Sequence, residues 1–395
     1  MRLLASVTVL SAALVAIGAP AVAHTPAGPD GHGSARRGPA SIQLEGRGYG
    51  HGHGMSQYGA QGAATQDGKS YRQILRFYYP GTDWGTAGRT VSVQISADTS
   101  DDVVVANRSR LRVRSVATGD SWPLSQQGAK RWRIVPTGHG RDSQVAVLTD
   151  GWHSVRDIRG EAELTAGGRP IRLFHPGGST RYRGALRSAI VGGGRETVNV
   201  LPLDSYLRGV VPQEMPASWD PEALKAQAVA ARTYAAFERR NPVASDYQIC
   251  DTSSCQVYGG ASAEQPGSDA AVRATRHQVL TSGGKPAFTQ FSASNGGWTV
   301  EADEPYLRAA RDPWDPWSGN PYAHWTVRVP ATAIERAYPS IGDFRRLKVT
   351  RRDGNGAWNG RALRVRVVGG RGSVAVSGDR FRSDLLLRST WFRVG

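Results

Sequence analysis

Residues 210–240, VVPQEMPASWDPEALKAQAVAARTYAAFERR, contain the strongest helix signal in the chain. Asp220 is a typical N-cap residue, Pro221 suits the first helical position, and Asn241-Pro242 ends the pattern. One stripe of this segment consists of Leu224, Ala228, Ala231 and Ala235. Small residues let a helix backbone approach its neighbours closely, so we expect a rigid Ala-rich helix over residues 221–240.

Glu214 precedes this helix and is flanked by Pro212, Pro216 and apolar residues. Burying an unpaired carboxylate is costly, and the usual response is a raised pKa. A carboxyl with a raised pKa is what a general acid requires. We therefore expect Glu214 to be held on a loop supported by the helix. The alternative is a solvent-exposed glutamate in a turn.

The rest of the chain is mostly strand and turn. Short alternating segments such as TVSVQIS (90–96), WRIVP (132–136) and IRLFH (171–175) fill residues 88–200, and similar segments return after residue 270. Tyr71, Ile74, Leu75 and Tyr78 follow the i, i+3, i+4, i+7 spacing of a short amphipathic helix. The pattern predicts an α+β fold: a mixed, β-rich domain with one long Ala-rich helix, plus a β-rich insert.

The N-terminus indicates export. Residues 1–23 combine Arg2, an apolar stretch and Ala21-Val22-Ala23, which is the pattern of a secretory signal peptide. Residues 24–40 are rich in Pro, Gly and charge and predict a flexible linker. No later stretch has the eighteen or so apolar residues that span a bilayer, so we expect no transmembrane segment after cleavage. The expected location is secreted and associated with the cell wall.

The formal net charge of +16 favours an anionic partner. For an exported protein this points to anionic wall polymers and not to nucleic acid. The alternative explanation of the charge is a high-GC genome, whose codon usage favours Arg over Lys.

Cys250 and Cys255 are the two cysteines of the chain. An even number at close spacing in an oxidising compartment favours a local disulfide. A zinc site is the less favoured alternative, because no C-x-x-C…H pattern lies nearby.

Several longer motifs stand out along the chain: VNVLPLDSYLRGVVPQEMPASWDPEALKAQAVAARTYA (198–235), CDTSSCQVYGG (250–260), FSASNGGWT (291–299), FRSDLLLRSTWF (381–392), GYGHGHGMSQYGAQGAA (48–64) and YRQILRFYYPGT (71–82). Together these motifs resemble the stage II sporulation protein D (SpoIID/LytB) family. In many members the Gly/His motif follows the RSTWF segment, whereas here it comes first, and we interpret this order as a circular permutation. The resemblance implies that residues 41–82 complete a catalytic domain formed by residues 178–395, with residues 88–177 as an insert of unknown role.

The resemblance also implies an activity, because characterised members of the family are lytic transglycosylases that cleave peptidoglycan glycan strands. The family's catalytic glutamate corresponds to Glu214. One carboxyl suffices if it protonates the glycosidic oxygen and then, as carboxylate, deprotonates the C6 hydroxyl that attacks the anomeric carbon. No cofactor or metal is needed. A wall-binding scaffold without turnover and a hydrolase that uses a second carboxylate remain alternatives.

Further residues are expected to bind the sugar. Two imidazoles on a constrained Gly/His loop indicate a direct role for this loop, so His51, His53, Ser56 and Gln57 are candidates. Ser294 and Asn295 are candidates for lining the groove, and Tyr258 for stacking on a sugar face. The alternative for Ser294 and Asn295 is a turn that ends a strand, and the alternative for Tyr258 is an aromatic side chain of the core.

Overall fold

The computed structural model describes residues 38–192 and 194–395. The expected signal peptide (1–23) and most of the expected linker (24–40) lie outside the described residues. Two compact units are formed, one by residues 52–295 and 299–320 and the other by residues 38–51 together with 296–298 and 321–395. The content of helices and strands confirms the expected β-rich α+β class. Within the described ranges, no helix is both long enough and apolar enough to cross a membrane.

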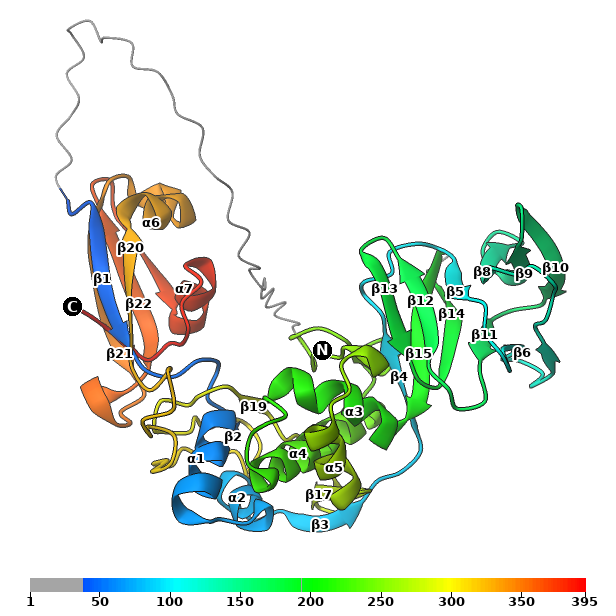
Figure 1. Ribbon diagram of the computed structural model, residues 1–395. Helices are drawn as coiled ribbons and strands as arrows, with labels where there is room; N and C mark the ends of the chain where they lie inside the picture. The colour runs from blue at the N-terminus through cyan, green and yellow to red at the C-terminus, as the bar shows by residue number, and fades with distance from the viewer. Residues whose placement is uncertain (1–37, 193) are drawn as a thin grey trace, which may run out of the picture. The chain divides into compact units, whose positions relative to one another are not determined.

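The first of these units, residues 52–295 with 299–320, is organised around the Ala-rich helix. Its helices are α1 (Gln57–Asp67), α2 (Tyr71–Tyr78), α3 (Leu203–Glu214), α4 (Pro221–Arg240) and α5 (Pro266–Ala274). The bounds of α2 and α4 are those that the sequence predicts. Asp220 caps α4, since its Oδ1 accepts a hydrogen bond from the Glu222 backbone N–H at 2.8 Å. The expected stripe of α4 is buried, and so are Gln227, Arg232 and Thr233 on its other faces. Burial is this extensive because α1, α2, α3 and α5 all pack on α4 (Figure 1).

Two larger sheets and two small ones complete this unit. The seven-stranded sheet has the order β16 (Ile249–Cys250), β4 (Thr90–Gln94), β15 (Gly194–Pro202), β14 (Ala185–Val191), β11 (Ala162–Thr165), β6 (Arg112–Ser115), β7 (Ser121–Pro123). The six-stranded sheet has the order β10 (Trp152–Ile158), β9 (Asp142–Leu148), β8 (Arg131–Thr137), β5 (Val103–Ala106), β12 (Ile171–His175), β13 (Gly178–Tyr182). The small sheets are β18 (Lys285–Pro286), β17 (Gln278–Ser282), β3 (Asp83–Thr86), and β19 (Phe291–Ser292) with β2 (Met55–Ser56).

The strands of the expected insert, residues 88–177, do not pair only among themselves. β4 pairs antiparallel with β15, and β11 lies between β6 and β14. A strand with one buried face is held in register by its neighbours, so these pairings join the expected insert to the sheet that leads into α3.

The other unit contains two three-stranded sheets. Their orders are β20 (Trp325–Pro330), β1 (Ser41–Gly46), β24 (Phe392–Val394), and β21 (Phe344–Arg352), β22 (Ala362–Gly369), β23 (Ser373–Ser377). Two short helices, α6 (Ala331–Ala337) and α7 (Gly378–Asp384), pack on these strands. The core includes Leu44, Trp325, Phe344, Phe381 and Phe392.

The expected segment 41–82 is thus divided between the two units after His51. Gly50 and Gly52 have φ values of 112° and 83° at this point, a backbone conformation that favours glycine. The alternation of Gly and His therefore fits a sharply turned connection.

Candidate active site

Glu214 is the last residue of α3, which corrects the expectation that it lies on a loop. Pro212 lies inside α3, and Met215 after the helix is extended with φ −135° and ψ 141°. The residue before a proline is sterically disfavoured in helical geometry, so Pro216 forces Met215 out of the helix. The helix consequently ends at the carboxyl-bearing residue. The negative end of the helix dipole lies there and disfavours a carboxylate.

Two hydrogen bonds hold the half-buried carboxyl of Glu214. The side-chain amide of Gln57 donates to Oε2 at 3.1 Å, and the backbone N–H of Val257 donates to Oε1 at 3.3 Å. Burial raises the pKa of Glu214 above its ordinary value, although both hydrogen bonds oppose the rise. Each carboxyl oxygen has two lone pairs, so one position per oxygen stays available to a substrate or a proton.

Val257 reaches Glu214 because the loop that carries it is anchored on both sides. Cys250 and Cys255 form the expected disulfide, with their Cα atoms 5.5 Å apart. Next to it, Gln256 accepts a hydrogen bond from the hydroxyl of Tyr206 at 3.2 Å. On the other side, the Gly259 N–H donates to the Gly209 carbonyl of α3 at 3.0 Å. A Cβ atom on Gly209 would meet the ring of Tyr258 at 2.6 Å, so this close approach of loop and helix needs a glycine.

Gln57 is positioned by the start of α1, where Ser56 is the N-cap. The Ser56 hydroxyl accepts a hydrogen bond from the Gly59 N–H at 3.0 Å and donates to Asp315. Asp315 also accepts hydrogen bonds from the Ser294 hydroxyl at 2.9 Å and from the Asn295 N–H at 3.1 Å. The structure therefore brings together three of the residues expected to bind sugar, around a carboxylate that they share.

Ser56, Ser294 and Asn295 are each 0% exposed, which corrects their expected direct contact with a sugar. Their polar atoms are satisfied by the protein interior, so they hold the start of α1 in place. Tyr258 is also buried: its hydroxyl donates to Asn199 at 2.8 Å. Tyr258 is therefore an aromatic of the core, the alternative that its sequence context left open.

Asp312 and Asp315 were missed by the sequence reasoning. The hydroxyl of Tyr78 donates to Asp312 at 2.6 Å, and the side-chain amide of Asn295 donates to the same oxygen at 2.7 Å. Burial and the neighbouring Asp315 raise the pKa of Asp312. The repeated DPWDPW at residues 312–317 is the signal that would have identified this pair.

The two histidines lie in different units. Nδ1 of His53 is 3.2 Å from the carbonyl oxygen of Val300, and residues 53 and 300 form an isolated parallel bridge. His51 is half-buried at the end of its own unit. No group of three or more His, Cys, Asp or Glu side chains in the described ranges is placed to hold a metal ion.

Asp204 and Asp220, the aspartates on either side of Glu214 in the sequence, have structural roles. Asp204 lies in the first turn of α3, ten residues and thus about 15 Å of helix from Glu214. It forms an ion pair with the buried Arg232 at 2.8 Å, and its Oδ2 lies 3.2 Å from Nδ1 of His277. Asp220 is the N-cap of α4.

Sequence comparisons relate the region around Glu214 to known proteins. The family model described as Stage II sporulation protein, SpoIID, matches residues 191–282, which include Glu214, Val257 and the disulfide. The amidase enhancer of Bacillus subtilis (strain 168) is 42% identical over 129 residues, which are 31% of this chain and 17% of that protein. Stage II sporulation protein D of Bacillus amyloliquefaciens is 32% identical over 204 residues, 45% of this chain and 53% of that protein. The protein of the same name from Bacillus subtilis (strain 168) is 33% identical over 141 residues, 30% of this chain and 41% of that protein. The chain thus spans between 17% and 53% of the length of these relatives.

Proposed function

Since this chain carries a domain of the stage II sporulation protein D family, we propose that it is an exported, cell-wall-associated lytic transglycosylase that cleaves peptidoglycan glycan strands. The observation that carries this proposal is the setting of Glu214. Its carboxyl is half-buried at the end of α3, its pKa is raised, and two N–H donors fix its orientation.

The chemistry follows from a single carboxyl that gives up its proton and recovers one in each cleavage. The protonated Glu214 gives its proton to the glycosidic oxygen while the bond from that oxygen to the anomeric carbon of the muramic residue breaks. The resulting carboxylate takes the proton of the C6 hydroxyl as the C6 oxygen attacks the anomeric carbon. The products are a glycan end with a free hydroxyl and a 1,6-anhydro end, and Glu214 is protonated again.

The two N–H donors suit both halves of this cycle. A hydrogen bond to a carboxylate is stronger than one to a neutral carboxyl, so Gln57 and Val257 stabilise the anion that exists between the two proton transfers. Burial and the helix end act in the opposite direction and favour the protonated form before cleavage. A pKa near the working pH is the compromise that general acid–base catalysis needs.

A hydrolase mechanism is less well supported by the geometry. Hydrolases that use a carboxyl pair place the two groups roughly 5 to 9.5 Å apart. Asp204 lies at the opposite end of α3 and is occupied by Arg232, while Asp220 caps α4. We therefore propose that Glu214 acts without a second carboxylate, and that residues 52–82 complete its site by supplying Gln57.

Glu214→Gln tests the proposal, because glutamine keeps the shape but cannot donate and recover a proton. General acid–base steps contribute about 10²- to 10⁴-fold, so the rate of glycan cleavage should fall by at least ~10²-fold. The matched control is Glu222→Gln in the first turn of α4, where the carboxylate accepts hydrogen bonds from Lys225 and the Tyr71 N–H. Mass spectrometry of digested glycan strands should find anhydro ends with wild type and with the control. Retention of most activity by Glu214→Gln would place the acid elsewhere.

A second candidate is a wall-binding protein without turnover, and the relative named amidase enhancer favours it. This candidate predicts that wild type and Glu214→Gln stimulate a separate amidase equally and that neither produces anhydro ends. Reducing ends in the same experiment would instead indicate a hydrolase.

A further inference from the structure

The sheet β21-β22-β23 carries an unusual concentration of positive charge on one face. Val365 and Val367 of β22 are fully buried, so the alternate positions of this strand face outward. The outward positions are Arg364 and Arg366 on β22, with Arg346, Lys348 and Arg351 on β21. We call these five residues the cationic face.

The register of the strands places like charges directly opposite each other. Lys348 pairs with Arg366, and Arg351 pairs with Arg364. On the other side of β22, Arg366 faces Ala375 and Arg364 faces Ser377. None of these register positions holds a carboxylate, and within the part of the chain that the structure describes no ion pair involves the cationic face. Like charges in opposed positions destabilise a sheet, so the face lowers the stability of the isolated fold.

Protection against edge-to-edge aggregation does not account for this pattern. Charged residues serve that purpose on edge strands. Arg364 and Arg366, however, lie on β22, which is the central strand of the three. An anionic partner that neutralises the face would remove the repulsion.

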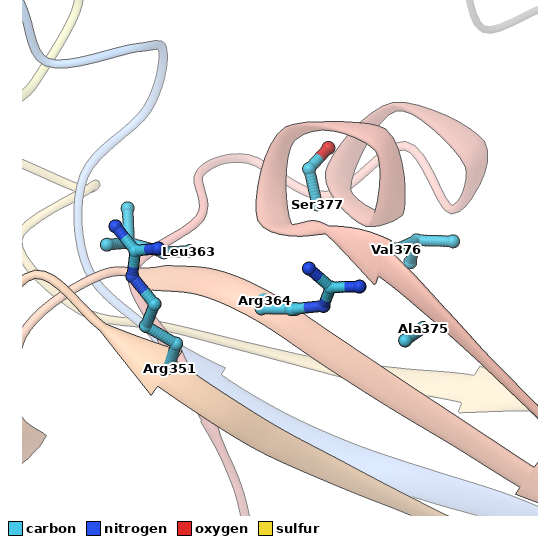
Figure 2. A pocket seen from close by; sticks show the side chains of 6 residues that line it. All are labelled: Arg351, Leu363, Arg364, Ala375, Val376 and Ser377. Atoms are coloured by element: carbon cyan, nitrogen blue, oxygen red, sulfur yellow. The ribbon is translucent and has the colours of Figure 1, made fainter.

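The shape of the face indicates what kind of anion it fits. Arg351 and Arg364, from neighbouring strands, line a hollow of about 370 Å³ together with Leu363, Ala375, Val376 and Ser377. Figure 2 shows the side chains of these six residues. Neighbouring strands lie about 4.8 Å apart, and outward residues of one strand recur about every 6.6 Å. The charges are therefore spread in rows over the sheet and do not converge on a point, which suits a polymer with regularly repeated charges.

We propose that the cationic face binds a phosphodiester polymer of the cell wall and thereby holds the chain on its substrate. Four of its five cations are arginine, whose planar fork pairs well with phosphate oxygens. Proteins that bind single-stranded nucleic acid stack bases on aromatic side chains. The outward positions of β22 and β23 beside the arginines are Val368, Ser373, Ala375 and Ser377, so these positions offer no such platform. The choice of a wall polymer over another polyanion rests on the proposed function.

The experiment uses the full chain with Glu214→Gln, so that binding is measured without cleavage. The probes are Gram-positive sacculi that retain their phosphodiester polymer and the same sacculi after its chemical removal. Arg351→Gln/Arg364→Gln/Arg366→Gln removes three charges of the cationic face. The control Arg76→Gln/Arg159→Gln/Arg336→Gln removes the same charge from dispersed exposed positions.

The triple variant of the cationic face should bind polymer-bearing sacculi on the order of tenfold more weakly, because three exposed charge contacts are lost together. The dispersed control should bind as the parent does, and stripped sacculi should bind all proteins equally weakly. The triple variant should also melt no lower than the parent, because opposed like charges are removed.

Three results would overturn the proposal: equal weakening by both triple variants, parent binding that survives removal of the polymer, or displacement by DNA at a lower phosphate concentration than by soluble poly(glycerol phosphate). The same arginine substitutions are also made in the chain that keeps Glu214, and the cleavage rate of this variant separates the binding proposal from the catalytic one. Cleavage of stripped glycan strands should then be unchanged, whereas failure of the proposed function would abolish cleavage in every protein.

Discussion

Replacement of Gln57 by leucine tests whether the contact between Gln57 and Glu214 sets the acidity of the carboxyl. The Gln57 amide donates to Glu214 Oε2 at 3.1 Å. A hydrogen bond to a charged group contributes about 1.5–3 kcal/mol, and one between neutral groups about 0.5–1.5 kcal/mol. The contact therefore favours the carboxylate over the carboxylic acid by about 1–1.5 kcal/mol. Since ~1.4 kcal/mol corresponds to one pKa unit, Gln57→Leu should raise the pKa of Glu214 by about one unit.

The assay is the pH dependence of kcat/KM for glycan cleavage, which reports the pKa of the free enzyme's essential acid. Cleavage starts from the protonated Glu214, so kcat/KM declines as the pH rises through this pKa. In Gln57→Leu the decline should begin about one pH unit higher. A variant that is merely damaged would lose rate at every pH without moving the decline.

Gln61→Leu is the control, one turn further along α1. Gln61 is also buried, but it accepts its hydrogen bond from the Asp220 N–H at 3.0 Å. This variant should keep the wild-type pH profile. If Gln57→Leu and Gln61→Leu gave the same profile, the reasoning that Gln57 acts on the acidity of Glu214 would be refuted.

Three further predictions concern stability and assembly. Glu214→Gln should raise the free energy of unfolding at neutral pH by about 0.5–2 kcal/mol, because wild type must hold a carboxylate where its pKa is raised. The folded state binds the Glu214 proton more tightly than the unfolded state does, so the gain in stability should be absent below the ordinary carboxyl pKa and complete above the raised one. Urea unfolding that lacked this pH dependence would contradict the prediction. Loss of the disulfide through Cys250→Ser/Cys255→Ser should lower stability by about 2 kcal/mol, and thiol counting on the unfolded wild type should detect no free thiol. A chain that begins at residue 88 lacks α1 and α2, which pack on α4, and it lacks Gln57. It should be insoluble and inactive, so a soluble chain of this length that cleaved glycan would disprove the domain proposal.

The sequence by itself determined the elements whose signals are local. α4 runs from Pro221 to Arg240 as predicted, because its cap, its proline and its terminating Asn-Pro all lie within one turn of the ends. The helix at residues 71–78 was equally readable from its 3.6-residue period. The disulfide followed from two cysteines at close spacing in a chain expected to be exported. The surroundings of Glu214 predicted the raised pKa of its carboxyl, but Pro212 concealed the helix that Glu214 ends.

The tertiary structure alone decided which groups surround Glu214. Gln57 lies 157 residues away from it in the sequence, and Asp315 lies 259 residues away from the N-cap Ser56 that it holds. Such contacts leave no trace in periodicity or capping, because they arise when separately formed helices pack on α4. The same reason explains why Ser294 and Asn295 were expected to line the groove. Their residue types indicate hydrogen bonding, but only the packed chain shows that their partners are the buried carboxylates of Asp312 and Asp315.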